Sequence, residues 1–166
     1  MMRAGSRCGS ALVEFAFAGI PILFVILSVI EISRGMWTYE TLSYAVTEAT
    51  RLAAVHGASC VTAPNNCPIF VADIAQRIAD SSHGLLADQM SVTLVSPGLG
   101  SVTCQLSDCL NNGAPVSPGD TPGANISVAA AYPFTSPMSV FFPGFGGSAS
   151  FGATTLHASS QEQIQF

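Results

Sequence analysis

A single carboxylate lies near the start of a long apolar segment. The segment runs from Gly9 to Ile30, and Glu14 is the one acidic residue within it. An ionised carboxylate in hydrocarbon costs several kcal/mol by most measures. Glu14 therefore either reaches back to the polar interface or meets a partner inside the membrane. The second possibility makes it the first candidate for a functional residue.

The segment has the dimensions of a membrane anchor. Its residues 10–30, rising about 1.5 Å each, span about 31 Å, close to the hydrocarbon thickness of about 30 Å. Arg3 and Arg7 precede the anchor. Because positive charge stays cytoplasmic, we expect the chain after Ile30 to lie outside. A cleaved secretory signal peptide is the alternative, but no small-x-small cleavage site leads from the apolar core into a polar stretch.

Beyond the anchor, charged residues and alanines follow in a definite order. A Glu-x-x-Arg element occupies residues 31–34, and an Ala-rich stretch runs over residues 44–55. Together with Gly9, Glu14-Phe15 and Pro21, this ordered set resembles the TadE-like family of Tad (Flp-type) pilus systems. The residues that carry the resemblance after the anchor are Glu31, Arg34, Ala45, Glu48, Ala49, Arg51 and Ala53.

The resemblance implies roles for the first residues of the anchor. In pilins a processing peptidase cuts after a glycine and leaves a glutamate at the fifth mature position. Cleavage after Gly9 would make Ser10 the first mature residue and Glu14 the fifth. The glutamate of pilins meets the free amino terminus of a neighbouring subunit, so Glu14 is expected to set the register of assembly. For Phe15, contact with lipid and packing against another helix remain equally open.

The anchor helix is predicted to continue outside the membrane. Apolar residues recur at steps of three and four over residues 39–56, which indicates an amphipathic helix that ends at Gly57. The result is one helix of about 45 residues, which Pro21 is expected to bend or loosen. Two pairs of residues three apart can form ion pairs on its surface: Glu31 with Arg34, and Glu48 with Arg51.

The five cysteines separate by their position relative to the anchor. Cys8 precedes the expected cut, whereas Cys60, Cys67, Cys104 and Cys109 fall outside, where oxidation is favoured. Four cysteines permit three pairings, and proximity in the sequence favours Cys60–Cys67 and Cys104–Cys109. Free thiols and a metal site are the alternatives, but the spacings do not fit those of zinc ligands.

The remaining chain is predicted to form a small sheet domain. A second short helix is expected over residues 68–84, beginning with Pro68. Strands are expected over residues 90–96 and 101–106, around residues 126–132, where apolar residues alternate, and around residues 151–155. The breaker-rich residues 111–124 and 134–147 are expected to be loops. The fold class is therefore α+β and pilin-like: a long N-terminal helix, transmembrane then amphipathic, packed on a small antiparallel sheet.

Composition and motifs argue against several functions. Charged residues make up only 9% of the chain and the net charge is −5, which leaves no basic surface for nucleic acid. The catalytic motifs G-x-S-x-G, Walker A and H-E-x-x-H are missing, as is an EF-hand loop. The histidines, His56, His83 and His157, are scattered and expected to be structural. We therefore expect no enzyme activity, no cofactor and no metal.

Four parts follow from this organisation: a leader over residues 1–9, a transmembrane anchor over 10–30, an amphipathic continuation over 31–57, and a disulfide-stapled domain over 58–166. The resemblance implies a pseudopilin, or minor pilin, that helps assemble or prime a Flp-type pilus at the bacterial inner membrane. Its expected partners are the prepilin peptidase, other pilins, the Tad assembly platform and membrane lipid. Its domain would be periplasmic or part of an extracellular pilus, with adhesion as the downstream role.

Two other hypotheses remain open. The chain could be an uncleaved, single-pass anchored binding module whose exported domain recognises a small molecule or an envelope component. An exported enzyme is the third, and it would need convergent polar residues in a pocket. Cleavage after Gly9 separates the first hypothesis from the second.

Overall fold

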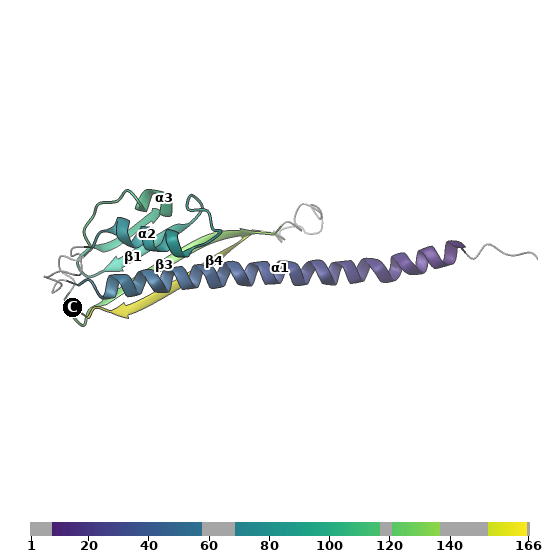
Figure 1. The fold of residues 1–166 in the computed structure, drawn as a ribbon, viewed down its shortest axis with the longest axis horizontal. Helices are drawn as coiled ribbons and strands as arrows, with labels where there is room; N and C mark the ends of the chain where they lie inside the picture. The colour runs from purple at the N-terminus through teal and green to yellow at the C-terminus, as the bar shows by residue number, and fades with distance from the viewer. Residues whose placement is uncertain (1–7, 58–68, 117–120, 137–152, 166) are drawn as a thin grey trace, which may run out of the picture. The chain divides into compact units, whose positions relative to one another are not determined.

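The computed structural model describes residues 8–57, 69–116, 121–136 and 153–165 of the chain (Figure 1). It divides into two compact units, Met1–Met36 and Trp37–Phe166, which are described separately below. Helix α1, Cys8–Ala54, supplies the whole described part of the first unit and continues into the second.

Helix α1 is continuous over 47 residues, in agreement with the single long helix that the sequence predicts. It passes through Pro21 without ending, and it stops at Ala54, three residues before the expected end at Gly57. Within the first unit, the hydroxyl of Ser28 donates to the carbonyl of Phe24 (2.8 Å), and that of Ser33 donates to the carbonyl of Val29 (2.7 Å). These bonds satisfy the polar side chains without a partner outside the helix, as an apolar environment requires.

In the second unit, α1 packs through a narrow and mostly small-residue face. Leu42, Ala45, Val46 and Ala49 are fully buried there. The hydroxyl of Thr50, also fully buried, donates to the carbonyl of Val46 at 2.7 Å. Alanine adds little bulk beyond the backbone, so this part of the helix can approach its neighbours closely. The core of the domain is built on this face.

The sheet has four antiparallel strands in the order β2-β1-β3-β4. Strands β1 (Ser91–Ser96) and β2 (Gly100–Gln105) form a hairpin, and Gly100 has a φ of 79°, a left-handed conformation that suits glycine at a turn. Strands β3 (Asn125–Thr135) and β4 (Ala153–Gln163) pair along their whole length. The predicted α+β fold with an antiparallel sheet is confirmed.

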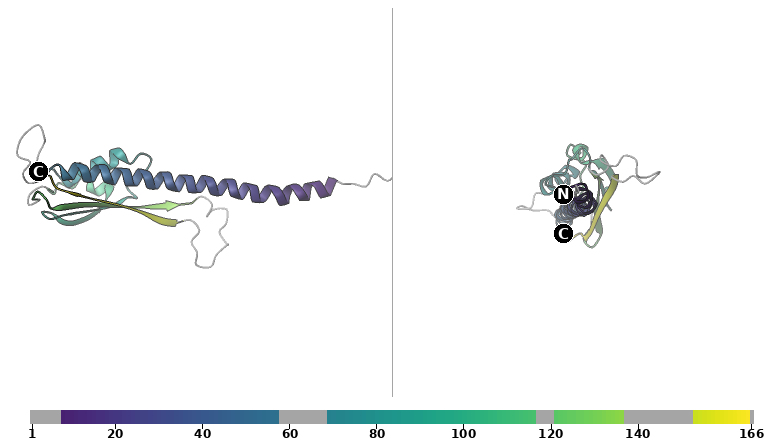
Figure 2. Two further views of the ribbon diagram at one scale, coloured as in Figure 1. Left: turned by 90° about the horizontal axis from the view of Figure 1, so that it is seen from below. Right: turned by 90° about the vertical axis from the view of Figure 1, so that its right-hand side faces the viewer.

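One face of the sheet carries the helices. Alternate residues of β1 and β3 are buried on it, including Val92, Leu94, Ile126 and Val128. Helix α2 (Val71–Ser81) covers this face beside α1, as the end-on view in Figure 2 shows. The buried residues of α2 are Val71, Ile74, Ala75 and Ile78. A short third helix, α3 (Leu106–Cys109), follows β2 directly.

Several predicted boundaries differ from the structure. Helix α2 begins at Val71 and not at Pro68, which lies outside the described residues. Its start is fixed by the backbone N–H of Phe70, which donates to the Asp73 carboxylate at 2.8 Å. Strand β3 continues through Pro133 to Thr135. Beyond Ala131 it pairs with β4 alone, so the missing N–H of Pro133 can face an unpaired edge.

Two further predictions are corrected in the same way. Phe134 belongs to β3, although the sequence indicated a loop from this residue onward; residues 137–147 of that loop lie outside the described residues. The last strand, β4, extends to Gln163, well past the expected residues 151–155, because all of it finds partners on β3. Phe151, the first residue expected in this strand, lies outside the described residues.

Candidate functional site

Glu14 lies in α1, six residues after Cys8, the first residue of the helix, and its side chain is exposed. Val13 and Phe15 beside it are 54% and 78% exposed. In the described part of the chain, nothing forms a hydrogen bond or ion pair with the Glu14 carboxylate. A charge on an apolar helix without an internal partner can be compensated only by the interface or by another molecule.

The expected cleavage site lies in the first turn of α1. The helix begins at Cys8, so Gly9 and Ser10 precede the regular hydrogen-bonded ladder and belong to the turn whose N–H groups lack helical acceptors. Along the axis, Ser10 and Glu14 are separated by about 6 Å at the usual helical rise. An amino terminus created at Ser10 would therefore be offset from Glu14 of its own helix by about one turn.

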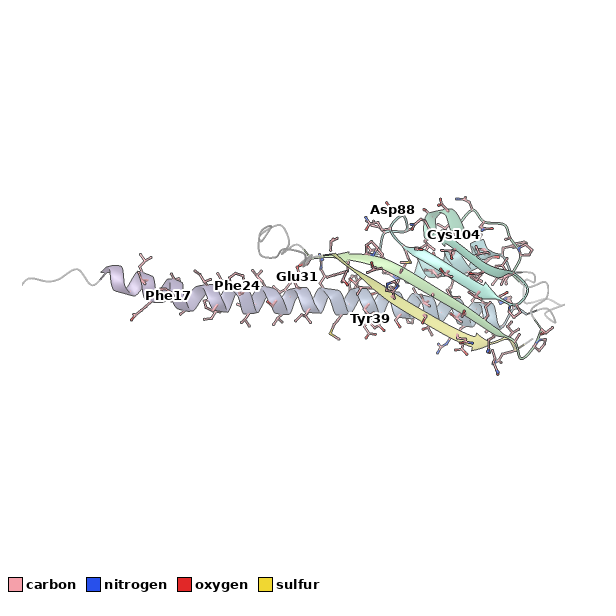
Figure 3. The ribbon with its side chains drawn as sticks, turned by 180° about the vertical axis from the view of Figure 1, so that it is seen from behind. Phe17, Phe24, Glu31, Tyr39, Asp88 and Cys104 are labelled. Atoms are coloured by element: carbon pink, nitrogen blue, oxygen red, sulfur yellow. A yellow bond between two sulfur atoms is a disulfide. The ribbon has the colours of Figure 1, made fainter. Side chains whose placement is uncertain are left out.

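Apolar side chains surround Glu14 and continue along α1 to Ile30. Phe17 and Phe24 project outward from α1 (Figure 3) and are 78% and 41% exposed. Among the described residues, α1 is the one helix long and apolar enough to cross a membrane. None of its most apolar stretch is buried by the protein itself. This surface fits lipid or the helices of other subunits, and it is the physical basis for a single-pass anchor.

The contacts of the described residues do not test the predicted ion pair between Glu31 and Arg34. Both residues lie on α1, three positions apart. The Oε2 atom of Glu31 is buried and has no hydrogen-bond partner in the described residues. The pair therefore stays a prediction.

Glu48 lies at the centre of a charged cluster on the second unit. Arg51 Nη1 is 3.4 Å from Glu48 Oε1, as the spacing of three residues allows. Arg77 of α2, which the sequence analysis did not connect with α1, places Nη2 3.2 Å from Glu48 Oε2. No sequence pattern connects Arg77 with Glu48, since 29 positions separate the two residues.

A disulfide joins Cys104 at the end of β2 to Cys109 at the end of α3, with their Cα atoms 5.7 Å apart. This is the pairing that proximity in the sequence favours. Cys109 is fully buried, so the bond fixes α3 to the core side of the sheet. Cys60 and Cys67, the other expected pair, lie outside the described residues.

The described residues offer little for catalysis. Within them, no three His, Cys, Asp or Glu side chains gather into a possible metal site. His56 Nδ1 lies 2.7 Å from the carbonyl of Leu52, a local contact within one helical turn. His157 borders a shallow depression of about 300 Å³ on the sheet, whose other lining residues are serine, threonine and alanine. No nucleophile, base and orienting group are brought together in this depression.

Comparison with known proteins gives one match. The family model described as TadE-like protein matches residues 9–51. The match includes the candidate residues of α1: Gly9, Ser10, Glu14, Phe15, Glu31, Arg34, Glu48 and Arg51. No curated protein and no solved structure matches the chain. The sheet domain, with Arg77 and the cysteines, lies outside the matched segment.

Proposed function

We propose that this chain, which the TadE-like family model matches over residues 9–51, is a pilus-associated pseudopilin, or minor pilin. It helps assemble or prime a Flp-type pilus at the inner membrane of a bacterium. The observation that carries this proposal is Glu14, an exposed carboxylate without an internal partner, on a helix whose surroundings are otherwise apolar.

The first step of the proposal is processing. A prepilin peptidase removes residues 1–9 by cutting the Gly9–Ser10 bond. The position of this bond in the first turn of α1 supports the step, because a terminal turn unwinds at little cost and a peptidase needs extended backbone. Glycine at position 9 also lets the enzyme approach the backbone closely.

The second step is registration within the membrane. Cleavage creates an ammonium group on Ser10, and the Glu14 carboxylate of a neighbouring subunit binds it. In a medium of low dielectric constant an unpaired charge is strongly disfavoured, so subunits that are out of register are rejected. Residues 10 and 14 are four apart on α1, so the ammonium group could also pair with Glu14 of its own helix. We place the pair between neighbouring chains, because only a pair between chains sets the register of one subunit against the next.

The proposed partners follow from these steps. They are the prepilin peptidase, other pilins or pseudopilins, the inner-membrane assembly platform of the Tad system, and lipid. Arg3 and Arg7 support a cytoplasmic N-terminus, and the disulfide between Cys104 and Cys109 supports an oxidising compartment for the domain. Adhesion through the assembled pilus is the proposed downstream role.

Intact mass of the membrane-extracted protein, in the wild type and in Gly9→Leu, tests the processing step. The wild type should lack residues 1–9, and the leucine side chain should block the cut and leave the full-length mass. Gly19→Leu is the matched control, since it adds the same side chain to α1 away from the cut. A wild-type protein that keeps its leader would instead support the uncleaved, anchored binding module.

A further inference from the structure

The fold gathers the basic residues of the domain at one place. Beyond Arg34 the chain contains only two, Arg51 and Arg77, separated by 26 positions in the sequence. Both lie within ion-pair distance of Glu48, at 3.4 and 3.2 Å. Their side chains are 65% and 50% exposed, whereas that of Glu48 is 20% exposed. We call Arg51 and Arg77 the basic pair.

The basic pair keeps positive charge and hydrogen-bond donors that Glu48 does not use. One carboxylate neutralises one of two guanidinium groups, so the cluster keeps a net positive charge. Each guanidinium has five N–H donors, and Glu48 occupies only a part of them. The exposed donors therefore face solvent in an arrangement that suits carboxylates, which arginine binds through two parallel hydrogen bonds.

A complementary surface lies elsewhere on the same domain. Asp88, before β1, and Asp108, in α3, are both exposed. The residues that precede them are joined by a hydrogen bond, from the N–H of Ser107 to the carbonyl of Ala87 at 3.3 Å. Figure 3 shows Asp88 at the outer margin of the domain. We call Asp88 and Asp108 the acidic pair.

The carboxylates of the acidic pair have no partner among the described residues. No hydrogen bond or ion pair there involves either carboxylate. In contrast, the Asp73 carboxylate accepts from the Phe70 N–H, and that of Asp80 accepts from the Gln76 side chain at 2.8 Å. The two aspartates of the acidic pair are thus available to a second molecule.

We propose that the basic pair of one copy of this chain docks on the acidic pair of a second copy. Two guanidinium groups meet two carboxylates in this contact, with opposite charges in register. The domain is otherwise acidic, so copies that approach through other charged faces repel each other. The two pairs are different surfaces, so the contact is heterologous and continues from copy to copy instead of closing into a dimer.

This contact extends the proposed function and does not depend on the chemistry of the anchor. All of its residues belong to the second unit, Trp37–Phe166. It would act together with the proposed pairing of Glu14 in the membrane. The Glu14 pair would align the anchor helices, and the contact between the basic and acidic pairs would align the domains. The two can be tested separately.

The test is co-purification of two differently tagged copies of the full chain in detergent, with two charge-reversed variants. The first variant carries Arg51→Glu and Arg77→Glu, and the second carries Asp88→Arg and Asp108→Arg. Each variant alone should recover its own second copy about tenfold less well than the wild type, because like charges now face each other. A mixture of the two variants should recover wild-type association, since both contacts become complementary again. High salt should weaken the wild-type contact.

Two controls keep the result interpretable. Glu40→Arg with Glu162→Arg changes the net charge as much as the second variant does and should not weaken association. Arg51→Gln with Arg77→Gln removes the basic pair without placing three acids together, and it should weaken association in a folded domain. Wild-type recovery by either reversed variant alone, or no rescue in the mixture of folded variants, would overturn the proposal. Leader cleavage, read by mass in the same samples, bears only on the proposed function.

Discussion

The two ends of helix α1 have the same backbone and opposite surroundings. In the first unit, large apolar residues such as Phe15, Leu23 and Val25 are 60% or more exposed. In the second unit, smaller residues such as Ala45 and Ala49 are fully buried. The apolar side chains of the first unit are left uncovered by the protein, whereas one face of α1 in the second unit packs into the core of the sheet domain. The two parts of α1 thus differ in whether the protein itself covers their apolar side chains.

The same leucine-to-alanine substitution should therefore change the stability of the domain in one part of α1 and not in the other. Leu42→Ala should destabilise the domain by about 3 kcal/mol, because Leu42 is fully buried and the cavity left behind cannot be filled. Leu23→Ala, on the exposed part of α1, should leave the unfolding transition in place. The measurement is thermal unfolding of the full chain in detergent, followed by the fluorescence of the single tryptophan, Trp37.

Trp37 is a suitable probe because its ring lies 3.0 Å from where a Cβ on Gly84 would stand, within the second unit. A decrease of about 10 °C or more in the midpoint is expected for Leu42→Ala. Equal decreases for both leucine variants would show that the two parts of α1 do not differ in the way proposed.

The disulfide should be the next largest contributor and should act on the domain alone. Replacing both Cys104 and Cys109 by serine removes a short cross-link and should lower the free energy of unfolding by about 2 kcal/mol. Reduction of the wild-type protein should lower it to a similar extent if the second predicted pair, Cys60–Cys67, contributes little. Insertion and leader cleavage should stay at wild-type levels. An unchanged unfolding midpoint would show that the disulfide does not stabilise the domain.

Two glycines make a smaller and matched comparison. Gly84 has a φ of 84°, and an added methyl group would stand 3.0 Å from the Trp37 ring. Gly84→Ala should therefore cost about 1–2 kcal/mol in backbone strain alone. Gly19 is helical, and its nearest neighbour for an added Cβ is a Phe15 ring atom at 3.9 Å, so Gly19→Ala should be neutral or stabilise the helix. Unfolding midpoints of the two variants test this difference, and a destabilising Gly19→Ala would contradict it.

The sequence predicted the regular parts of this fold because each has a local period. The apolar run and the steps of three and four residues predicted α1, and the alternation around residues 126–132 predicted the centre of β3. It did not predict α3, since four residues are too few to show a helical period. The sequence also placed the end of β3 too early. Pro133 has no N–H to donate, but β3 pairs only with β4 beyond Ala131, so the missing N–H can face an edge without a partner strand.

The residues of the candidate site also differ in whether the sequence alone could predict their proximity. Gly9, Ser10 and Glu14 lie within six positions, so the sequence alone shows the spacing that resembles a pilin processing site, and their roles stay a prediction. The contact between Glu48 and Arg77 joins residues 29 positions apart, and only the packing of α2 beside α1 brings them together. The hydrogen bond that joins the residues before Asp88 and Asp108 links α3 to the segment before β1, and no sequence pattern indicates it.

The central claim is that Glu14 of one subunit binds the new amino terminus of another, and its removal tests this most directly. Glu14→Gln should insert and be cleaved normally, because the substitution makes the anchor less costly to insert and leaves Gly9 in place. Glu40→Gln, an exposed acid of the second unit, is the matched control. The measurement is the count of pili, with co-purification of other pilins, in cells whose protein is confirmed by mass to be processed. The account predicts loss of both for Glu14→Gln alone; wild-type piliation and partner recovery by the processed variant would contradict it.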